Sequence, residues 1–200
     1  MNLPQQIQSA TYLSYTWGRS RSPGYAFKTP EKFDDGLREQ ITKLFGWMAY
    51  KQMANLTDAS VVVGAPPRTT IKWGVQDHLD ELLCAIEQVN FRVLRNVFAY
   101  KDDEILLADT TAAATIRDSP MIIVDNLLNT RRTVSKFATK LAEVGAAEIH
   151  LCILARWIDG SPEAIQVARD FRASICSNQP THRTAPDRLT AREKRLLYTS

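Results

Sequence analysis

The sequence predicts an α/β fold in which a mainly parallel sheet carries helices on both of its faces. Short apolar runs such as residues 60–64 and 121–124 alternate with longer stretches whose apolar residues recur at helical spacing. The apolar runs lack the polar alternation of a half-exposed sheet, which is typical of parallel strands buried on both faces. With 200 residues, 44% of them hydrophobic and 24% charged, the chain is long enough to form one such domain with a buried core.

The first half of the chain predicts an extended segment, two helices and two strands. Residues 7–15 are expected to pair as a short extended segment, and residues 60–64 form a β-branched run that ends in Gly-Ala-Pro-Pro. Residues 75–89 have apolar positions on one helical face, and residues 91–100 are rich in Val and Phe, which favours a strand. Residues 34–55 predict a helix from apolar positions near helical spacing, namely Leu37, Ile41, Leu44, Phe45, Met48 and Met53.

The middle of the chain contains the clearest strand. Residues 121–124 read Met-Ile-Ile-Val, and we expect Asp125 and Asn126 to end the strand. The preceding stretch, residues 101–118, begins with charged residues and continues through Thr and Ala. Its pattern fits a loop, or a loop that contains a short helix.

The second half continues the alternation of helices and strands. Residues 132–144 predict a helix with one apolar face, and Gly145 is suited to the position that follows a helix end. Residues 149–154 predict another buried strand. Ser161 and Pro162 then open a last helix, with Ser as the N-cap and Pro in the first turn.

The chain divides by composition into three parts. Residues 1–33 form a segment rich in loop-forming and aromatic residues, residues 34–176 form the α/β domain, and residues 177–200 form a tail. The tail holds five basic and two acidic residues, so its net charge equals the +3 of the whole chain. Two interpretations follow: a solvated, flexible end, or a basic segment that binds single-stranded nucleic acid or an acidic partner.

Cysteine and histidine patterns predict neither zinc nor a disulfide. Cys84, Cys152 and Cys176 have no C-x-x-C spacing and lie in apolar segments, where a free cysteine behaves as a small hydrophobic residue. The three histidines are scattered. No apolar run approaches the length of a membrane helix, and the N-terminus lacks the pattern of a secretory signal. We therefore expect a cytoplasmic protein that makes no contact with membranes.

The predicted fold places three loops together at the carboxyl ends of the strands: residues 64–70, 100–117 and 125–133. In the third loop an acid follows a strand, and hydroxyl groups and free backbone amides precede a helix. Amides, hydroxyls and the positive end of the helix dipole favour an anion, and the acid can accept hydrogen bonds from sugar hydroxyls. Together these groups suit a ribose 5-phosphate unit. The chain has no Walker A motif, no G-x-G-x-x-G after a strand and no G-x-S-x-G.

This third loop resembles the signature of the type I phosphoribosyltransferases, in which an apolar strand precedes two acids, two apolar residues and Thr-Thr-Gly-x-Thr. Asp125 takes the place of the first acid, and Asn126 stands where the second is expected. Leu127 and Leu128 match the apolar pair. In the phosphate-binding stretch Arg131 replaces Gly; the stretch comprises Asn129, Thr130, Arg131, Arg132 and Thr133.

The resemblance extends to other segments and is strongest toward the competence-protein F (ComF-like) branch, although the cysteine zinc module of that branch is absent here. The matching pyrophosphate loop is Ala65-Pro66-Pro67-Arg68, and residues 100–117 fall where the family has a mobile hood. In the last strand, Leu154-Ala155-Arg156 also looks like the ComF-like branch.

The resemblance implies substitution at the anomeric carbon of phosphoribosyl pyrophosphate (PRPP), with Mg²⁺ arriving on the pyrophosphate and no direct metal ligand from the chain. It implies that Asp125 holds the ribose hydroxyls, that Thr130 to Thr133 hold the 5-phosphate and that Arg68 faces the pyrophosphate. Members of the family commonly pair, so a homodimer is the expected assembly.

The departures from the motif leave two hypotheses open. Asn126 removes a negative charge that would stabilise a developing cation, and Arg131 adds a cation suited to phosphate contact. The first hypothesis is a transferase or pyrophosphorylase acting on a phosphoribosyl or nucleotide substrate. The second is a non-catalytic binder of a nucleotide or nucleic acid that uses the same phosphate cradle and the basic tail, as a regulator or accessory protein.

Overall fold

The computed structural model describes residues 7–16, 34–53, 60–66, 79–89, 91–128, 131–157, 161–162 and 165–166. Five strands form the central sheet: β1 (Ile7–Thr16), β2 (Val61–Gly64), β3 (Arg92–Leu94), β6 (Pro120–Leu128) and β7 (Glu148–Trp157). Their order is β1-β7-β6-β2-β3, and every neighbouring pair is parallel. The helices around the sheet are α2 (Asp35–Met53), α3 (Asp80–Glu87), α4 (Ala113–Ile116) and α5 (Arg131–Val144).

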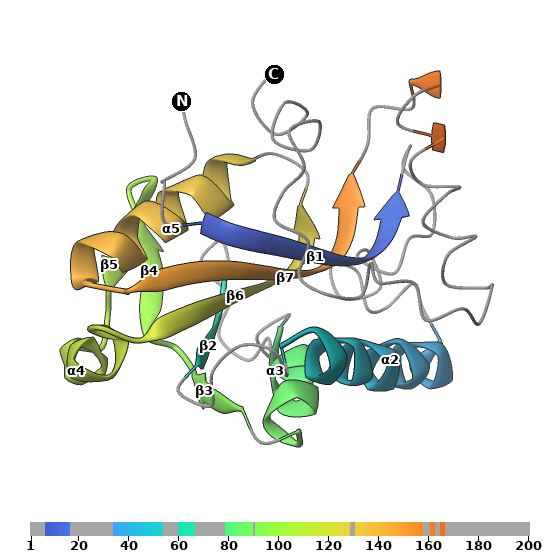
Figure 1. Cartoon of the computed structure of the whole chain (residues 1–200), viewed down its shortest axis with the longest axis horizontal. Helices are drawn as coiled ribbons and strands as arrows, with labels where there is room; N and C mark the ends of the chain where they lie inside the picture. Colours follow the sequence, from blue (N-terminus) through green and yellow to red (C-terminus); the bar gives the residue numbers. More distant parts are fainter. Residues whose placement is uncertain are drawn as a thin grey trace.

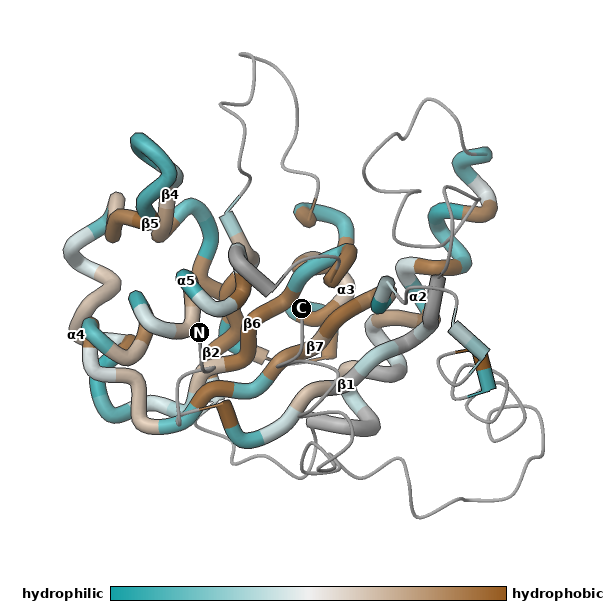
Figure 2. The backbone as a smooth tube through the Cα atoms, turned by 90° about the horizontal axis from the view of Figure 1, so that it is seen from above, coloured by the Kyte–Doolittle hydropathy of each residue, from teal (hydrophilic) through white to brown (hydrophobic). Residues whose placement is uncertain are grey.

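The helices cover both faces of the sheet, which confirms the predicted fold class. In Figure 1, α5 lies on one side of the strands, and α2 and α3 lie on the other. Every residue from Met121 to Leu128 in β6 is buried, as expected for a central strand between two helical layers. Figure 2 shows the hydrophobic stretches concentrated along the central strands. The largest fully buried side chains are Phe45, Phe137, Leu79, Leu82, Ile86, Ile116, Met121, Ile122, Ile123, Leu141, Ile149 and Ile153.

Helix α2 confirms the predicted helix but not its predicted apolar face. Phe45 and Ala49 are buried, whereas Leu37 and Leu44 are exposed. The helix packs against α3 at Gly46, where a Cβ atom would lie 3.1 Å from the Cβ and the carbonyl oxygen of Ala85. Helix α2 lies beside α3 on one side of the sheet (Figure 1), and Leu37 and Leu44 fall on the part of its surface that the described residues leave exposed.

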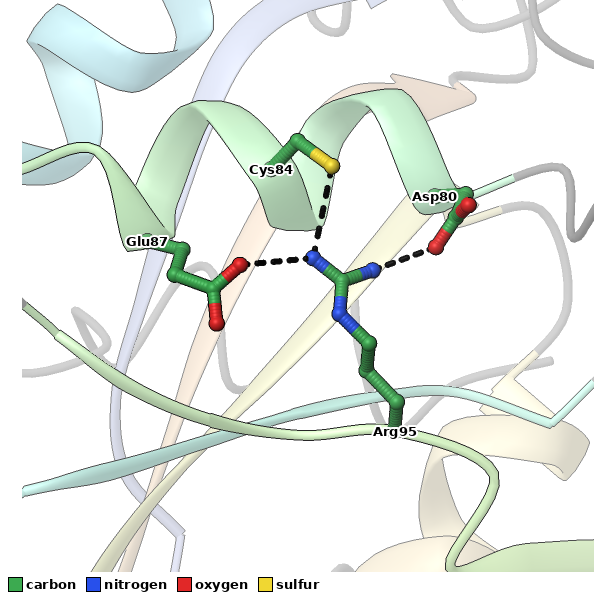
Figure 3. Close-up of polar contacts among 4 residues, drawn as sticks. All are labelled: Asp80, Cys84, Glu87 and Arg95. Atoms are coloured by element: carbon green, nitrogen blue, oxygen red, sulfur yellow. Dashed lines mark hydrogen bonds and ion pairs between the residues drawn. The ribbon is translucent and has the colours of Figure 1, made fainter.

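The prediction of one strand over residues 91–100 was wrong. Asn96 adopts a left-handed conformation with φ 55°, which breaks the strand into β3 and a second strand, β4 (Phe98–Lys101). Arg95, in the connection, reaches back to helix α3 (Figure 3): it binds Asp80, and it donates to Glu87 Oε2 at 3.1 Å and to Cys84 Sγ at 3.4 Å.

Arg95 and its three partners Asp80, Cys84 and Glu87 form the Arg95 cluster, which holds the chain against α3 at the point where it leaves the sheet. Burial opposes the charge of Arg95, but its contacts with Glu87, Cys84 and Asp80 outweigh burial and raise the pKa of the guanidinium. The cluster also corrects the expectation for Cys84, which is exposed rather than buried. Cys152 follows the expectation, because burial raises the pKa of its thiol to about 12.

Residues 101–118 contain more regular structure than either sequence interpretation allowed. Strand β5 (Glu104–Leu107) pairs antiparallel with β4, and a 3₁₀ turn, η2 (Thr110–Ala112), then leads into α4. Asp102 and Asp103 form the two-residue hairpin turn with φ values of 51° and 64°. The turn requires positive φ at both positions, which Asp tolerates better than most residues, so the charged pair is compatible with a tight hairpin.

Strand β6 extends beyond its predicted end. The sequence indicated that Asp125 and Asn126 would end the strand, but β6 continues to Leu128. The neighbouring strand β7 is also longer than predicted, and its register pairs Asp125 with Ile153 and Leu128 with Arg156. Polar residues after an apolar run are typical of a strand end, but here the pairing with β7 continues past Asp125 and Asn126.

Helix α5 confirms the predicted helix and its ending. Gly145 has φ 105°, and its amide donates to the carbonyl of Ala142 at 3.0 Å. The amide of Ala146 donates to the carbonyl of Leu141 at 3.0 Å, which completes a Schellman motif. This motif turns the chain directly back toward the sheet, so that β7 begins beside β6.

The N-terminal strand β1 confirms the expected extended segment and forms an edge of the sheet through parallel pairing with β7. Ser9 and His150 are buried partners across this pair, and Ser9 Oγ lies 2.8 Å from His150 Nδ1. On the other side of the ring, His150 Nε2 lies 3.4 Å from Glu148 Oε2. Burial lowers the pKa of the imidazole and the Glu148 carboxylate opposes this effect.

The predicted last helix lies mostly outside the described residues. In the described part, the Ile165 amide donates to the Ser161 carbonyl at 2.9 Å, which is a helical hydrogen bond. The divisions at residues 33/34 and 176/177 also fall outside and stay predictions. No helix within the described ranges is both long and apolar enough to cross a membrane.

We expect stability to fall at mildly acidic pH because of His150. Its pKa is lowered by folding, so the unfolded chain takes up the proton first as the pH decreases. The free energy of unfolding should therefore decline below about pH 6.5, by at most about 1.4 kcal/mol per pH unit. Urea denaturation between about pH 7.5 and 5 measures this slope, and the non-titrating His150→Gln variant should lack it. Equal slopes in the two proteins would contradict the assignment.

Candidate functional site

The topology places the candidate site where the connection direction reverses. From β2 the chain moves to β3 on one side, and it then returns to β6 on the other side of β2. In parallel sheets such a switch point opens a crevice at the carboxyl ends of the two central strands. Residues 65–66 follow the end of β2, and β6 ends at Leu128 shortly before α5 begins at Arg131, so the described parts of two of the three predicted loops adjoin the same edge of the sheet.

The loop after β2 lies close against β6 and α3. The Ala65 amide donates to the Val124 carbonyl at 2.8 Å, so this amide prolongs the sheet pairing instead of facing a ligand. Ala65 and Pro66 are buried. A Cβ at Gly64 would lie 3.2 Å from Leu83 Cδ1 and 3.3 Å from Leu79 Cδ1 of the helix, so glycine permits this close approach. The predicted pyrophosphate contacts Pro67 and Arg68 lie outside the described residues.

Asp125 and Asn126 lie within β6 and are almost fully buried, with 8% and 3% of their surfaces exposed. The Asp125 carboxylate accepts a hydrogen bond from the Asn126 backbone amide at 2.8 Å. The expectation of an acid at an open strand tip was therefore wrong. Continued pairing with β7 keeps both side chains between the helical layers.

The two polar side chains point to opposite faces of the sheet. Gly64 pairs in register with Val124, and the Cβ direction of Gly64 leads to helix α3. Because side chains alternate along a strand, Asn126 shares this face and Asp125 faces the other, where α5 lies. In the resembled motif the two positions form an adjacent pair of acids. The strand geometry instead gives Asp125 alone access to the α5 side.

The predicted phosphate-binding stretch leads into α5. Asn129 and Thr130 lie outside the described residues, as do the side chains of Arg131 and Arg132. The α5 backbone begins at Arg131, and Thr133 is half-buried in its first turn. The first turn of a 14-residue helix supplies free amides and a partial positive charge, which favour an anion. This helix start follows directly on the strand that carries Asp125.

Arg156 is a site feature to which sequence reasoning gave no functional role. It is 6% exposed, it pairs in register with Leu128 at the carboxyl end of β6, and its guanidinium lies 5.1 Å from the centroid of the Tyr12 ring. A cation–π contact of this kind holds a guanidinium in place. The sequence does hold a signal for Arg156: it is a single charged residue directly after the largely apolar residues 149–155. Charged residues are rarely buried without a partner or a function, so its position indicates a specific role.

The hairpin formed by β4 and β5, in the segment expected as a hood, is attached to α5. Phe98 and Phe137 meet edge to face, with ring centroids 4.9 Å apart. Lys136 Nζ of α5 lies 2.8 Å from Asp103 Oδ2 in the hairpin turn. Lys101 and Asp102 are exposed. The helix that begins at the candidate phosphate site therefore also carries this hairpin.

Metal ligands are few in this region. Within the described ranges, no group of three or more His, Cys, Asp or Glu residues could hold a metal ion. Asp125 is the carboxylate that β6 places near its carboxyl end. A magnesium ion that arrives on the pyrophosphate of a substrate needs no direct ligand from the chain and is compatible with this arrangement.

No protein-family model and no curated protein sequence matches the chain. Solved structures are similar at low identity. A hypoxanthine phosphoribosyltransferase from Staphylococcus aureus has a TM-score of 0.41 and 10% identity over 62% of this chain and 76% of that one. A hypoxanthine-guanine phosphoribosyltransferase from Bacillus anthracis gives a TM-score of 0.43 and 12% identity, over 61% of this chain and 79% of that one.

An orotate phosphoribosyltransferase from Mycobacterium tuberculosis, in complex with inorganic phosphate, has a TM-score of 0.38 and 16% identity. Its match covers 63% of this chain and 64% of that one. At TM-scores below 0.5, these likenesses carry no conclusion about what this chain binds or does.

Asp125 should contribute to folding through its acceptor oxygen. Asp125→Ala removes the acceptor for the buried Asn126 amide and should lower the free energy of unfolding by about 1–3 kcal/mol. Asp125→Asn retains an oxygen at that position and should cost less. Urea denaturation of both variants measures the difference. An Asp125→Ala variant as stable as the parent would show that the hydrogen bond does not support β6.

Proposed function

We propose that the chain binds a phosphoribosyl or nucleotide ligand in the crevice between the carboxyl ends of β2 and β6. The proposal rests on the closeness of two features along the chain. Asp125 lies on the α5 side of β6, and α5 begins shortly after this strand, at Arg131. A carboxylate can accept hydrogen bonds from sugar hydroxyls, and the start of the helix can hold a phosphate. Asp125 and the motif that follows it are also the residues on which the resemblance to the type I phosphoribosyltransferases rests.

The reaction that we propose is substitution at the ribose anomeric carbon. The bond from that carbon to the pyrophosphate oxygen breaks, pyrophosphate departs with the bonding electron pair, and an acceptor nucleophile bonds to the carbon. In this proposal Asp125 holds the ribose hydroxyls, Asn129 to Thr133 hold the 5-phosphate and Arg68 faces the pyrophosphate. The buried Arg156 also lies at this edge of the sheet, but its pairing with Leu128 places it on the face of Asn126 and not on that of Asp125.

Magnesium enters this proposal with the pyrophosphate group of the substrate. When bound, Mg²⁺ would neutralise part of the charge of the leaving group. The chain contributes no direct metal ligand in this proposal, and no described cluster of His, Cys, Asp or Glu would hold the ion by itself. The proposal also places the protein in the cytoplasm and in the ComF-like branch of the family, as the sequence motifs suggest.

A second candidate function is favoured by the placement of Asn126. Its amide is neutral where the family motif has an acid, and the strand directs it to the face opposite Asp125. A single carboxylate stabilises a developing cation less than two. The same crevice would then hold a nucleotide or a nucleic-acid phosphate without turnover, and Arg131, Arg132 and the basic residues 177–200 would extend the positive surface.

Both candidate functions require a phosphoribosyl or nucleotide ligand at this site, and binding of PRPP tests that requirement. Isothermal titration should show binding that strengthens with Mg²⁺, and Asp125→Asn should weaken binding at least about tenfold because a neutral amide is a weaker acceptor than a carboxylate. Thr139→Ala, an exposed change on α5, is the control and should bind normally. Absence of PRPP and nucleotide binding in the parent protein would refute the proposed ligand class.

Restoring the family motif separates the enzyme from the binder. Asn126→Asp combined with Arg131→Gly should raise the rate of pyrophosphate release if the chain is a transferase with reduced activity. In a dedicated binder the same pair of substitutions should weaken binding and create no turnover.

Deletion of residues 177–200 tests whether the tail binds nucleic acid. If it does, the shortened protein should bind a single-stranded oligonucleotide more weakly than the full chain, and its affinity should depend less on salt. Unchanged affinity and salt dependence would exclude a role of the tail.

A further inference from the structure

His150 is a buried titratable group that the candidate site does not use. It lies near the start of β7, with 7% of its surface exposed, and it pairs in register with Ser9 of β1 and with Ile122 of β6. Ser9 is buried as well, and its Oγ lies 2.8 Å from His150 Nδ1. This contact joins β1 to β7 near the amino ends of the two strands, away from the carboxyl ends that form the candidate site.

The surroundings of the ring suit a neutral imidazole better than a charged one. A neutral ring with its proton on Nε2 accepts a hydrogen bond at Nδ1 from the Ser9 hydroxyl. A second proton, on Nδ1, would leave that hydroxyl without its acceptor. Among the described residues, the other polar side chain recorded at the ring is Glu148, and Ile122 on the β6 side is apolar.

Glu148 compensates a positive charge on the ring only in part. Its Oε2 lies 3.4 Å from His150 Nε2, and Nε2 makes no hydrogen bond with the residues that the structure describes. The Glu148 side chain is 54% exposed, so water weakens its attraction for the ring. Burial accordingly lowers the pKa of the imidazole more than the Glu148 carboxylate raises it. A proton on His150 is therefore bound less tightly while the ring stays buried.

Strand β1 is the element whose movement exposes His150 with the loss of the fewest strand contacts. Figure 1 shows β1 running along β7 at the edge of the sheet, whereas β6 is held between β2 and β7. Release of β1 breaks its pairing with one described strand and leaves the centre of the sheet intact. Both the imidazole and Ser9 would then be hydrated, so the open form accepts the proton that the closed form disfavours.

We propose that protonation of His150 releases β1 from β7, so that β1 acts as a strap at the edge of the sheet that opens as the pH falls. Above about pH 6.5 His150 is neutral in both forms, and the closed form is favoured. Below this pH the open form takes up the proton first. Opening should then become more frequent by up to about tenfold per pH unit, until the closed form is protonated as well.

Opening of the strap also changes the carboxyl edge of the sheet. Farther along β1, the buried Tyr12 places its ring 5.1 Å from the guanidinium of Arg156. Release of the strand withdraws this ring and removes the cation–π contact that holds the guanidinium. Protonation at one end of the β1–β7 pair therefore reaches Arg156 at the other end, and this effect needs no ligand at the candidate site.

Hydrogen exchange of the ¹⁵N-labelled full chain distinguishes release of β1 from unfolding of the whole chain, which also exposes His150. Protection factors, which correct for the intrinsic pH dependence of exchange, are measured from about pH 7.5 to 5 at several urea concentrations below the unfolding transition. The β1 amides should lose protection by up to about tenfold per pH unit below about pH 6.5. Their protection should depend weakly on urea, because release of one strand exposes little surface, whereas the β6 amides should be better protected and depend strongly on urea. Equal protection and equal urea dependence of the two strands at every pH would overturn the proposal.

Two variants separate the titration of His150 from a general weakening of the strand pair. His150→Gln does not titrate, so its β1 amides should have the same protection at pH 5 as at pH 7.5, both values being approximate. Ser14→Ala is the matched control: it removes the hydrogen bond of 3.0 Å that Ser14 Oγ donates to the Leu154 carbonyl in the same pair. This control should lower the protection of β1 at every pH and keep the full pH dependence. A pH dependence that persists in His150→Gln, or that Ser14→Ala abolishes, would contradict the role of His150. Circular dichroism checks the fold of each variant, and if His150→Gln does not fold, the comparison of β1 with β6 in the parent protein decides.

Discussion

Parallel pairing of β6 between β2 and β7 is the constraint on which the rest of the structure depends. Because both neighbours pair along β6 and helices cover both faces, every side chain from Met121 to Leu128 is buried. The same pairing brings the Ala65 amide to the Val124 carbonyl and sets Arg156 beside Leu128. Each part of the candidate site takes its position from this one strand.

The pairing also limits what the site can do chemically. Asp125 and Asn126 are neighbours in the sequence, but an extended strand directs them to different faces. In the proposed function, a ligand on the α5 side would meet the Asp125 carboxylate, the start of α5 and the hairpin that Lys136 and Phe137 contact. Asn126 lies on the side of α3. The replacement of an acid by a neutral amide at this position also spares the core a second buried carboxylate.

Sequence patterns predicted the fold better than the site. The pattern of apolar residues was sufficient to predict α5 and the central strands. Gly145 correctly marked the end of α5. The ends of β6 and β7 were missed because strand length depends on the neighbouring strand, which one segment alone does not reveal. Asn96 divides the predicted strand of residues 91–100 through a backbone conformation that hydrophobicity does not record. Leu37 and Leu44 fit a helical pattern, but the pattern cannot distinguish a face toward the core from one toward solvent.

If a phosphoribosyl ligand binds at the carboxyl ends of β2 and β6, it should perturb the backbone amides there. A titration of the ¹⁵N-labelled protein with ribose 5-phosphate, followed by amide chemical shifts, measures this. The perturbed amides should cluster at residues 64–66 and 125–133, with smaller changes around Arg156, and the amides of α2 should stay unchanged. Perturbations that centre on α2 and α3, or that are absent from the start of α5, would rule out this binding site.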